Sequence, residues 1–161
     1  MTPSITERAA GSILGTLITY YTPQAIIKVQ ATGVRPEDLG PHNGRQQAVY
    51  RAILHLHKVG GHVDTVTVAA FLTQHGWLEK AGGWAYLELL AVSAVPSALK
   101  DHARLLANEG RHRRFERAFE AALEGARARN DAQVEAAVEA YMEAKVQVGL
   151  RVVEGGKADA A

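Results

Sequence analysis

Residues 97–152 read SALKDHARLLANEGRHRRFERAFEAALEGARARNDAQVEAAVEAYMEAKVQVGLRV, and their composition is the most informative feature of the chain. The stretch is rich in Ala, Glu, Arg and Leu, which are strong helix formers. Its only glycines are Gly110, Gly125 and Gly149. We predict two long helices, over about residues 97–122 and 131–152, with a turn near residues 125–130. At 1.5 Å of rise per residue each helix is roughly 30–40 Å long, so the stretch predicts a long antiparallel helical hairpin.

The second arm of this hairpin carries a heptad seam, in which residues recur at spacings of four and three: Val134, Val138, Tyr141, Lys145, Val148 and Val152. Such a seam packs against a facing helix, and the lysine within it biases the register. Within one chain the partners on the first arm are Leu99, Leu106, Phe115, Phe119 and Ala122. The alternative is a bundle between chains, because a two-helix arm has no apolar cover on its outer side.

The seam therefore also predicts self-association into a homodimer or higher oligomer. The residues we expect to carry it are Leu106, Phe115, Phe119, Val134, Val138, Tyr141, Lys145 and Val148.

The first 96 residues predict a compact helical head. Apolar residues recur at helical spacing in a first helix over about residues 6–20. Pro23 suits the first turn of a second helix, with Thr22 as its N-cap. A loop with a short turn at residues 36–39 follows, and then a helix over about residues 45–59.

The segment that follows is ambiguous. Residues 63–68 alternate like a short strand, but Asp64 or Thr65 is a good N-cap, so we favour a helix reaching Gln74. A single turn at residues 77–80 and a helix over 84–92 complete the head. The prediction is an all-α protein with a globular head (1–96), a hairpin (97–152) and a flexible tail (153–161).

Composition excludes several classes of protein. The 161 residues carry a formal charge of +1 and a 47% hydrophobic fraction, which is typical of one globular domain. Cysteine is absent, which excludes disulfides, thiolate metal sites and cysteine nucleophiles. No apolar stretch approaches the roughly 18 residues of a membrane span, and the start does not resemble a signal peptide. We expect a cytoplasmic protein that binds no membrane.

The motifs of the common catalytic sites do not occur. There is no Gly-x-x-x-x-Gly-Lys-Ser/Thr loop, Gly-x-Ser-x-Gly elbow, His-Glu-x-x-His helix or dinucleotide fingerprint. His55 and His57 lie about 200° apart on their predicted helix and cannot share a metal there. We expect no cofactor, no metal and no catalytic activity in this chain. A small enzyme with a histidine and carboxylate site in the head is a minor alternative.

Charge is segregated along the hairpin. Residues 111–129 hold six arginines and three glutamates, whereas the charged residues of 131–143 are all acidic. The strongest cluster comprises Arg111, Arg113, Arg114 and Arg117. It forms a solvated or ion-paired surface, a docking surface for an acidic protein, or a weak contact to DNA. Direct DNA binding is the least favoured, because no exposed aromatic residues accompany the arginines.

Several motifs together resemble a known family. They are GHVDTVTV at 61–68, GWLEKAGGWAYLEL at 76–89, VPSA at 95–98, SILG at 12–15, PEDL at 36–39 and VYRAI at 49–53. In this order and spacing they resemble the N-terminal domain of DnaB-type replicative DNA helicases, over about residues 5–150.

The resemblance implies a helical globule followed by a helical hairpin. It further implies a scaffold role, in which hairpins pair, the pairs form a collar on the helicase, and the collar docks primase or a loader protein. ATP hydrolysis belongs to a RecA-like domain that this chain does not contain. The function we expect is a non-catalytic interaction module of DNA replication whose partners are a replicative helicase, primase or loader.

Some residues depart from the pattern of the family. Ala10-Gly11 stands where Glu-Gln is frequent, Gln46 stands where a histidine is frequent, and Gly110 is unexpected within the first arm and suggests a kink. These differences bear on partner choice more than on fold. The short polar tail favours a free-standing relative, which caps or competes with a helicase collar, over a fragment of a longer helicase.

Overall fold

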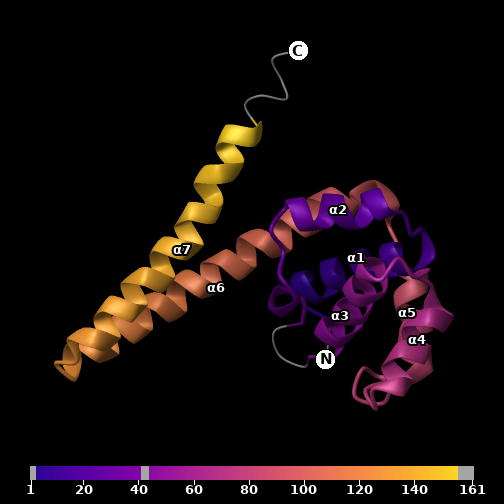
Figure 1. Cartoon of the computed structure of the whole chain (residues 1–161), viewed down its shortest axis with the longest axis horizontal. Helices are drawn as coiled ribbons and strands as arrows, with labels where there is room; N and C mark the ends of the chain where they lie inside the picture. Colours follow the sequence, from indigo (N-terminus) through magenta and orange to yellow (C-terminus); the bar gives the residue numbers. More distant parts are fainter. Residues whose placement is uncertain (1–2, 41–43, 156–161) are drawn as a thin grey trace. The chain divides into compact units, whose positions relative to one another are not determined.

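The computed structural model describes residues 3–40 and 44–155, and the side chains among them as far as residue 146. Over these residues the fold is all-α, as predicted. Its elements are α1 (Ile5–Thr19), α2 (Pro23–Ala31), the 3₁₀ turn η1 (Pro36–Asp38), α3 (Arg45–Lys58), α4 (Thr65–Gln74), α5 (Gly83–Val92), the 3₁₀ turn η2 (Pro96–Ala98), α6 (Leu99–Arg127) and α7 (Asp131–Gly155) (Figure 1). In this part of the chain no helix is both long and apolar enough to cross a bilayer.

The chain forms two compact units, Met1–Gly110 and Arg111–Ala161. The first unit contains α1 to α5 and the beginning of α6, and the second contains the rest of α6 and α7. The prediction divided the chain into residues 1–96, 97–152 and 153–161. Its first boundary lies where the long helices begin, rather than after Gly110. It stays a prediction, and most of its tail segment lies outside the described residues.

Two helix starts follow directly from the predicted caps. The Thr22 hydroxyl accepts a hydrogen bond from the backbone N–H of Ala25 at 3.1 Å, and Pro23 opens α2. The Asp64 carboxylate accepts a hydrogen bond from the backbone N–H of Thr67 at 2.7 Å. The Thr67 hydroxyl accepts one from the backbone N–H of Asp64, which completes a capping box. Residues 65–68 are therefore helical, and the strand alternative for this segment is wrong.

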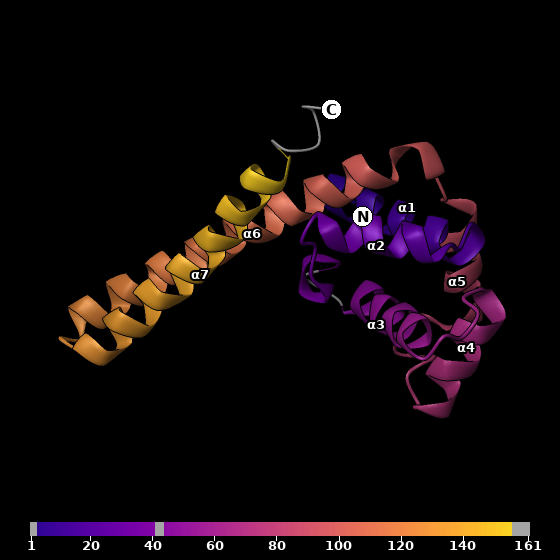
Figure 2. The ribbon, with the colours of Figure 1, turned by 45° about the horizontal axis from the view of Figure 1, so that its top comes forward.

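The core of the first unit is built around α1, which contacts α3, α4 and α5 (Figure 2). Gly15 of α1 lies against the backbone of α5, where a Cβ atom would overlap the carbonyl oxygen of Leu90. The Ser93 hydroxyl of the segment after α5 donates to the carbonyl of Gly11 at 3.1 Å. Only a residue without a side chain at position 15 allows this close approach of the two helices.

The first half of α6 completes the same core. We expected Leu99 and Leu106 to be partners of the hairpin seam. They are instead buried in this core. Gly110 lies within α6, which is helical from Leu99 to Arg127, and the kink suggested at this glycine stays a prediction. Its role is steric, because a Cβ atom at Gly110 would overlap the carboxylate of Asp38 in η1.

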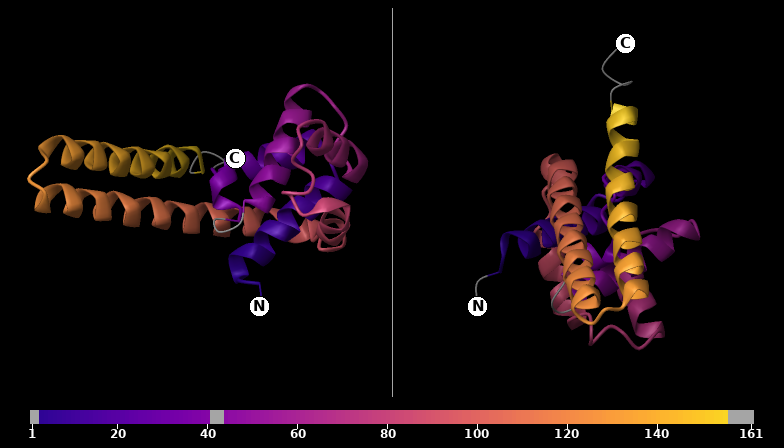
Figure 3. Two further views of the ribbon diagram at one scale, coloured as in Figure 1. Left: turned by 90° about the horizontal axis from the view of Figure 1, so that it is seen from below. Right: turned by 90° about the vertical axis from the view of Figure 1, so that its left-hand side faces the viewer.

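The second unit is an antiparallel pair of helical segments, residues 111–127 of α6 and all of α7 (Figure 3). The turn between them closes with a hydrogen bond from the backbone N–H of Asn130 to the carbonyl of Gly125 at 2.8 Å. The Asn130 side chain then accepts from the backbone N–H of Gln133 at 3.2 Å, which caps the start of α7. The predicted turn and antiparallel hairpin are thus confirmed.

Substituting Gly15 tests the close contact of α1 with α5. Gly15→Ala would force the Leu90 carbonyl away and should lower the free energy of unfolding by about 1–3 kcal/mol. Gly11→Ala on the same helix is the matched control, because its Cβ would lie 3.7 Å from the nearest atoms, and it should be neutral or stabilising by up to about 1 kcal/mol. Chemical denaturation measures both, and equal stabilities would contradict this packing.

The buried Tyr50 gives the core a sensitivity to alkaline pH. Burial, and secondarily the negative charge of Asp38, raise the pKa of Tyr50 from 10.0 to about 12. Its hydroxyl has no hydrogen-bond partner among the described residues. Between pH 10 and 12 the phenol ionises in the unfolded chain and stays neutral in the folded one, so the stability falls as the pH rises.

Tyr50→Phe should therefore reduce this alkaline loss by an amount on the order of 2–3 kcal/mol at pH 12. At pH 7 the substitution should cost little, because no hydrogen bond is lost. Urea denaturation at pH 7, 10 and 12 measures the effect. An alkaline loss of the same size in both proteins would contradict the assignment to Tyr50.

Candidate interaction surfaces

The two helices of the second unit meet along an inner seam of mostly small residues. Its buried members are Ala118, Gly125, Ala137 and Ala144. A Cβ atom at Gly125 would lie 3.1 Å from Gln133 and Val134, so the helices approach closely beside the turn. Because Ala and Gly leave little apolar bulk, large residues of the pair remain outside the seam.

Tyr141 and two phenylalanines of α6 form the aromatic part of the inner seam. The Tyr141 ring centroid lies 5.1 Å from that of Phe115 and 5.2 Å from that of Phe119. Tyr141 and Phe115 are half-buried, whereas Phe119 is exposed. Phe119 therefore marks the edge at which the inner seam gives way to the surface.

Five large apolar side chains form what we call the outer face. Their exposed fractions are Phe119 60%, Leu123 52%, Val138 52%, Met142 49% and Val146 55%. Phe119, Val138 and Met142 each follow a seam residue by one position, which turns them roughly 100° away from the seam, and Leu123 and Val146 lie one helical turn after Phe119 and Met142. Because the two helices are antiparallel, the same turn on both brings the side chains to one side of the pair.

The predicted self-association residues divide between these locations. Phe115, Val134 and Tyr141 lie half-buried at the inner seam, and Phe119 and Val138 lie on the outer face. Lys145 is exposed. Leu106 must be removed from the set, because its side chain is fully buried in the core of the first unit. Val148 lies outside the residues whose side chains are described.

The outer face contains three residues that the sequence analysis missed, namely Leu123, Met142 and Val146. The missed signal is the four-residue spacing of residues 138, 142 and 146, and of 119 and 123. A heptad seam was traced through Val138 and Lys145 instead.

The four predicted arginines do not form one open basic surface. Arg111, Arg113 and Arg114 are half-buried, and each takes part in an interaction within the chain. Arg117 is exposed. The ion-paired or solvated surface, the docking of an acidic protein and the contact with DNA therefore all stay predictions for these residues.

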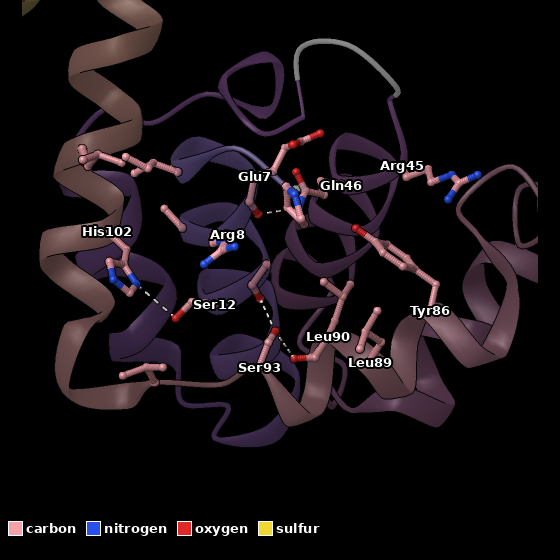
Figure 4. A pocket seen from close by; sticks show the side chains of 16 residues that line it. Glu7, Arg8, Ser12, Arg45, Gln46, Tyr86, Leu89, Leu90, Ser93 and His102 are labelled. Carbon is pink, nitrogen blue, oxygen red and sulfur yellow. Dashed lines mark hydrogen bonds between the residues drawn. The ribbon is translucent and has the colours of Figure 1, made fainter. Parts of the chain in front are cut away.

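The first unit holds a cavity of about 970 Å³, which we call the large cavity (Figure 4). Its walls come from the beginnings of α1, α3 and α6 and from α5. Three apolar side chains on its lining are strongly exposed, namely Ile5 at 75%, Leu89 at 61% and Val95 at 40%. The volume and the apolar lining are within the range of sites that bind ligands or partner side chains.

One wall of the large cavity contains a buried amide. Gln46 is 5% exposed, and its Nε2 donates to the carbonyl of Glu7 at 2.9 Å. Its Oε1 has no hydrogen-bond partner among the described residues. An unpaired buried acceptor costs about 1–3 kcal/mol, so this wall of the cavity carries a local cost in stability.

The charged groups around the large cavity are mostly basic. Arg8 and Arg45 line it together with one carboxylate, Glu7. Figure 4 shows Tyr86 beside Gln46. Burial raises the pKa of the Tyr86 phenol, while Gln46 and the positive charge of Arg45 act in the opposite direction. The cavity therefore suits an apolar group accompanied by negative charge.

His102 and Ser12 form a polar contact in the same wall. The His102 Nδ1 lies 3.0 Å from the Ser12 hydroxyl, which ties α6 to α1. A nucleophilic serine would also need a carboxylate that orients the imidazole. Within the described ranges no hydrogen bond joins His102 to a carboxylate, and no three His, Asp or Glu side chains are placed to hold a metal ion.

The fold defines a class of protein, namely all-α domains with an antiparallel helical hairpin. The chain belongs to the DnaB-like helicase N-terminal domain family, whose model matches residues 4–108. The resemblance seen in the motifs at 61–68 and 76–89 is thus confirmed. The matched domain is the part of these helicases that lacks the ATPase.

Two relatives show how far the similarity extends. The replicative DNA helicase DnaB of Rhodothermus marinus is 36% identical over 69 residues, which are 42% of this chain and 7% of that protein. The crystal structure of the N-terminal domain of DnaB helicase from Mycobacterium tuberculosis aligns with a TM-score of 0.74 at 28% identity. It covers 84% of this chain and 95% of the solved one. This chain therefore spans a small part of the full-length relative and nearly all of the isolated domain.

Proposed function

We propose that this chain is a non-catalytic interaction module of DNA replication that associates with itself through the outer face. Family membership supports the replication setting. The observation that carries the proposal is the outer face itself, where five large apolar side chains are about half exposed on one side of a two-helix unit. Covering the exposed half of each contributes on the order of 1 kcal/mol.

The charges of the two arms favour a second copy as the occupant of the outer face. Residues 111–129 carry six arginines and three glutamates, and residues 131–143 carry four acids and no base. A two-fold pairing that sets α6 of one copy against α7 of the other opposes positive charge to negative charge. The same surface then serves both partners, as an isologous dimer requires.

Placing charge on the outer face should abolish this association. We expect the unmodified chain to form a dimer or a larger assembly, and Leu123→Glu combined with Met142→Glu to be monomeric. Ala136→Glu combined with Ala140→Glu is the matched control, because both alanines are exposed on α7 but point away from the outer face. Sedimentation equilibrium over a range of concentrations measures the mass. A monomeric unmodified chain, or equal loss in the control, would contradict the proposal.

The large cavity supports a second role, the docking of a protein partner. Its exposed apolar lining and basic neighbours suit an apolar protrusion flanked by acidic residues. Among the partners expected for this family, primase, a loader protein and the helicase itself are the candidates. Binding to the helicase would make the chain a regulator that competes for a place in the collar.

One pair of variants on α5 tests this role. Leu89→Asp should weaken binding of purified primase, loader or helicase roughly tenfold or more, because it places a charge on the apolar rim. Val92→Asp is the control, since Val92 is 81% exposed and does not line the cavity. Titration calorimetry with each partner measures the affinities. Equal affinities of the two variants for every partner that binds would exclude the cavity as the docking site.

A further inference from the structure

Four aromatic rings from α3, α4 and the segment directly after α4 stack in a row, and we call them the ring ladder. Its members in order are His55, Phe71, His75 and Trp77, with ring centroids 4.8, 4.2 and 5.3 Å apart. The planes of successive rings are tilted by only 31–38°. His55 and His75 are exposed and Trp77 is 41% exposed, so the stack lies at the surface rather than in the core.

Backbone and side-chain hydrogen bonds hold the ladder in place. The His75 Nδ1 donates to the carbonyl of Phe71 at 2.8 Å, which fixes the imidazole beside the phenyl ring. The backbone N–H of Trp77 donates to the carbonyl of Leu72 at 2.7 Å. The aromatic surface is thus preorganised, and a ligand that stacks on it loses little freedom of the protein.

A hollow of about 310 Å³ adjoins the end of the ladder. Trp77, Arg51 and Lys80 line it together with Gln47, Ala48 and Gly44. Of the described residues that line this hollow, two are cationic and none is acidic. Arg51 precedes His55 by four residues on α3, so the hollow and the ladder share one face of that helix.

An exposed indole next to two cations matches the chemistry that binds single-stranded nucleic acid. Bases stack on aromatic rings, while lysine and arginine neutralise the phosphates between them. A purely acidic peptide would use Arg51 and Lys80 but gain nothing from the face of Trp77. The hollow has room for a planar group at the end of a stack, and the ladder continues the aromatic surface beyond it.

We propose that this face of the first unit binds a single-stranded nucleic acid, with a base stacked on Trp77 and phosphates held by Arg51 and Lys80. The site is separate from the arginine cluster of residues 111–117 and does not rest on the function proposed above.

The two tryptophans of the chain provide a built-in comparison. Trp84 is 43% exposed, as open to water as Trp77, but its Nε1 donates to the carboxylate of Glu88 at 2.8 Å. A phosphate is repelled by that carboxylate, so Trp84 is not a site for nucleic acid. Trp84→Phe leaves Trp77 as the only source of tryptophan fluorescence, and Trp77→Phe leaves Trp84.

The first experiment titrates each of these two proteins with the 12-nucleotide oligomer of deoxythymidylate at low ionic strength. The emission of Trp77 should be quenched in a saturable way, and the emission of Trp84 should not change. Thymidine monophosphate and inorganic polyphosphate serve as the other probes. Absence of quenching, or quenching by the mononucleotide at the same concentrations as by the oligomer, would overturn the proposal of a single-strand site.

The second experiment tests the cations by fluorescence anisotropy of a labelled oligomer. Arg51→Glu combined with Lys80→Glu should weaken binding at least tenfold and reduce the salt dependence of the logarithm of affinity by about 1.4, for two lost phosphate contacts. Lys28→Glu combined with Lys100→Glu changes the net charge equally on exposed residues outside the hollow. Equal weakening by both pairs, or equal competition by polyphosphate, would reduce the effect to net charge and overturn the proposal.

A substitution of the indole completes the test. Trp77→Ala should weaken binding of the oligomer roughly fivefold or more, whereas Trp77→Phe should retain most of it. Circular dichroism confirms that each variant is folded before it is compared. An unchanged affinity of folded Trp77→Ala would show that no base stacks at this position.

Discussion

Two antiparallel helices can bury only the strip along which they touch, and this constraint determines which side chains of the second unit meet water. The strip is filled by small residues, Ala118, Gly125, Ala137 and Ala144, which bring the helices close together and leave the larger side chains outside. Water then meets the outer face on one side of the pair. A chain that keeps apolar bulk in such a place gains stability from a neighbour, and a second copy brings the complementary charges as well.

The first unit builds its two candidate sites from different residues of one helical core. The close contact of α1 with α5 at Gly15, and of α6 with η1 at Gly110, fixes the helices whose beginnings line the large cavity. The ring ladder uses a later part of α3, together with α4 and the segment directly after it. Protein docking and nucleic-acid binding are therefore compatible on the same unit, because the residues that line the large cavity and the hollow are different.

Local signals predicted most of the fold, and packing decided the rest. Thr22 and Asp64 each cap a helix by accepting a hydrogen bond from the backbone N–H three residues later, so the starts of these helices were predictable from the sequence. The register of the hairpin was not, because the buried Ala137 and Ala144 carry little hydrophobic signal while the exposed Val138 carries more. The large cavity and the ring ladder bring together residues from separate helices, so no local sequence pattern predicts them.

The most direct test of the account is a thiol-accessibility measurement on the second unit, which the absence of cysteine makes simple. Single cysteines at Val138 and Met142 report on the outer face, and single cysteines at Ala136 and Ala140 report on exposed positions away from it. If copies of the chain associate through the outer face, alkylation of residues 138 and 142 slows as the protein concentration rises, while residues 136 and 140 react at a constant rate. Constant rates at all four positions would contradict it.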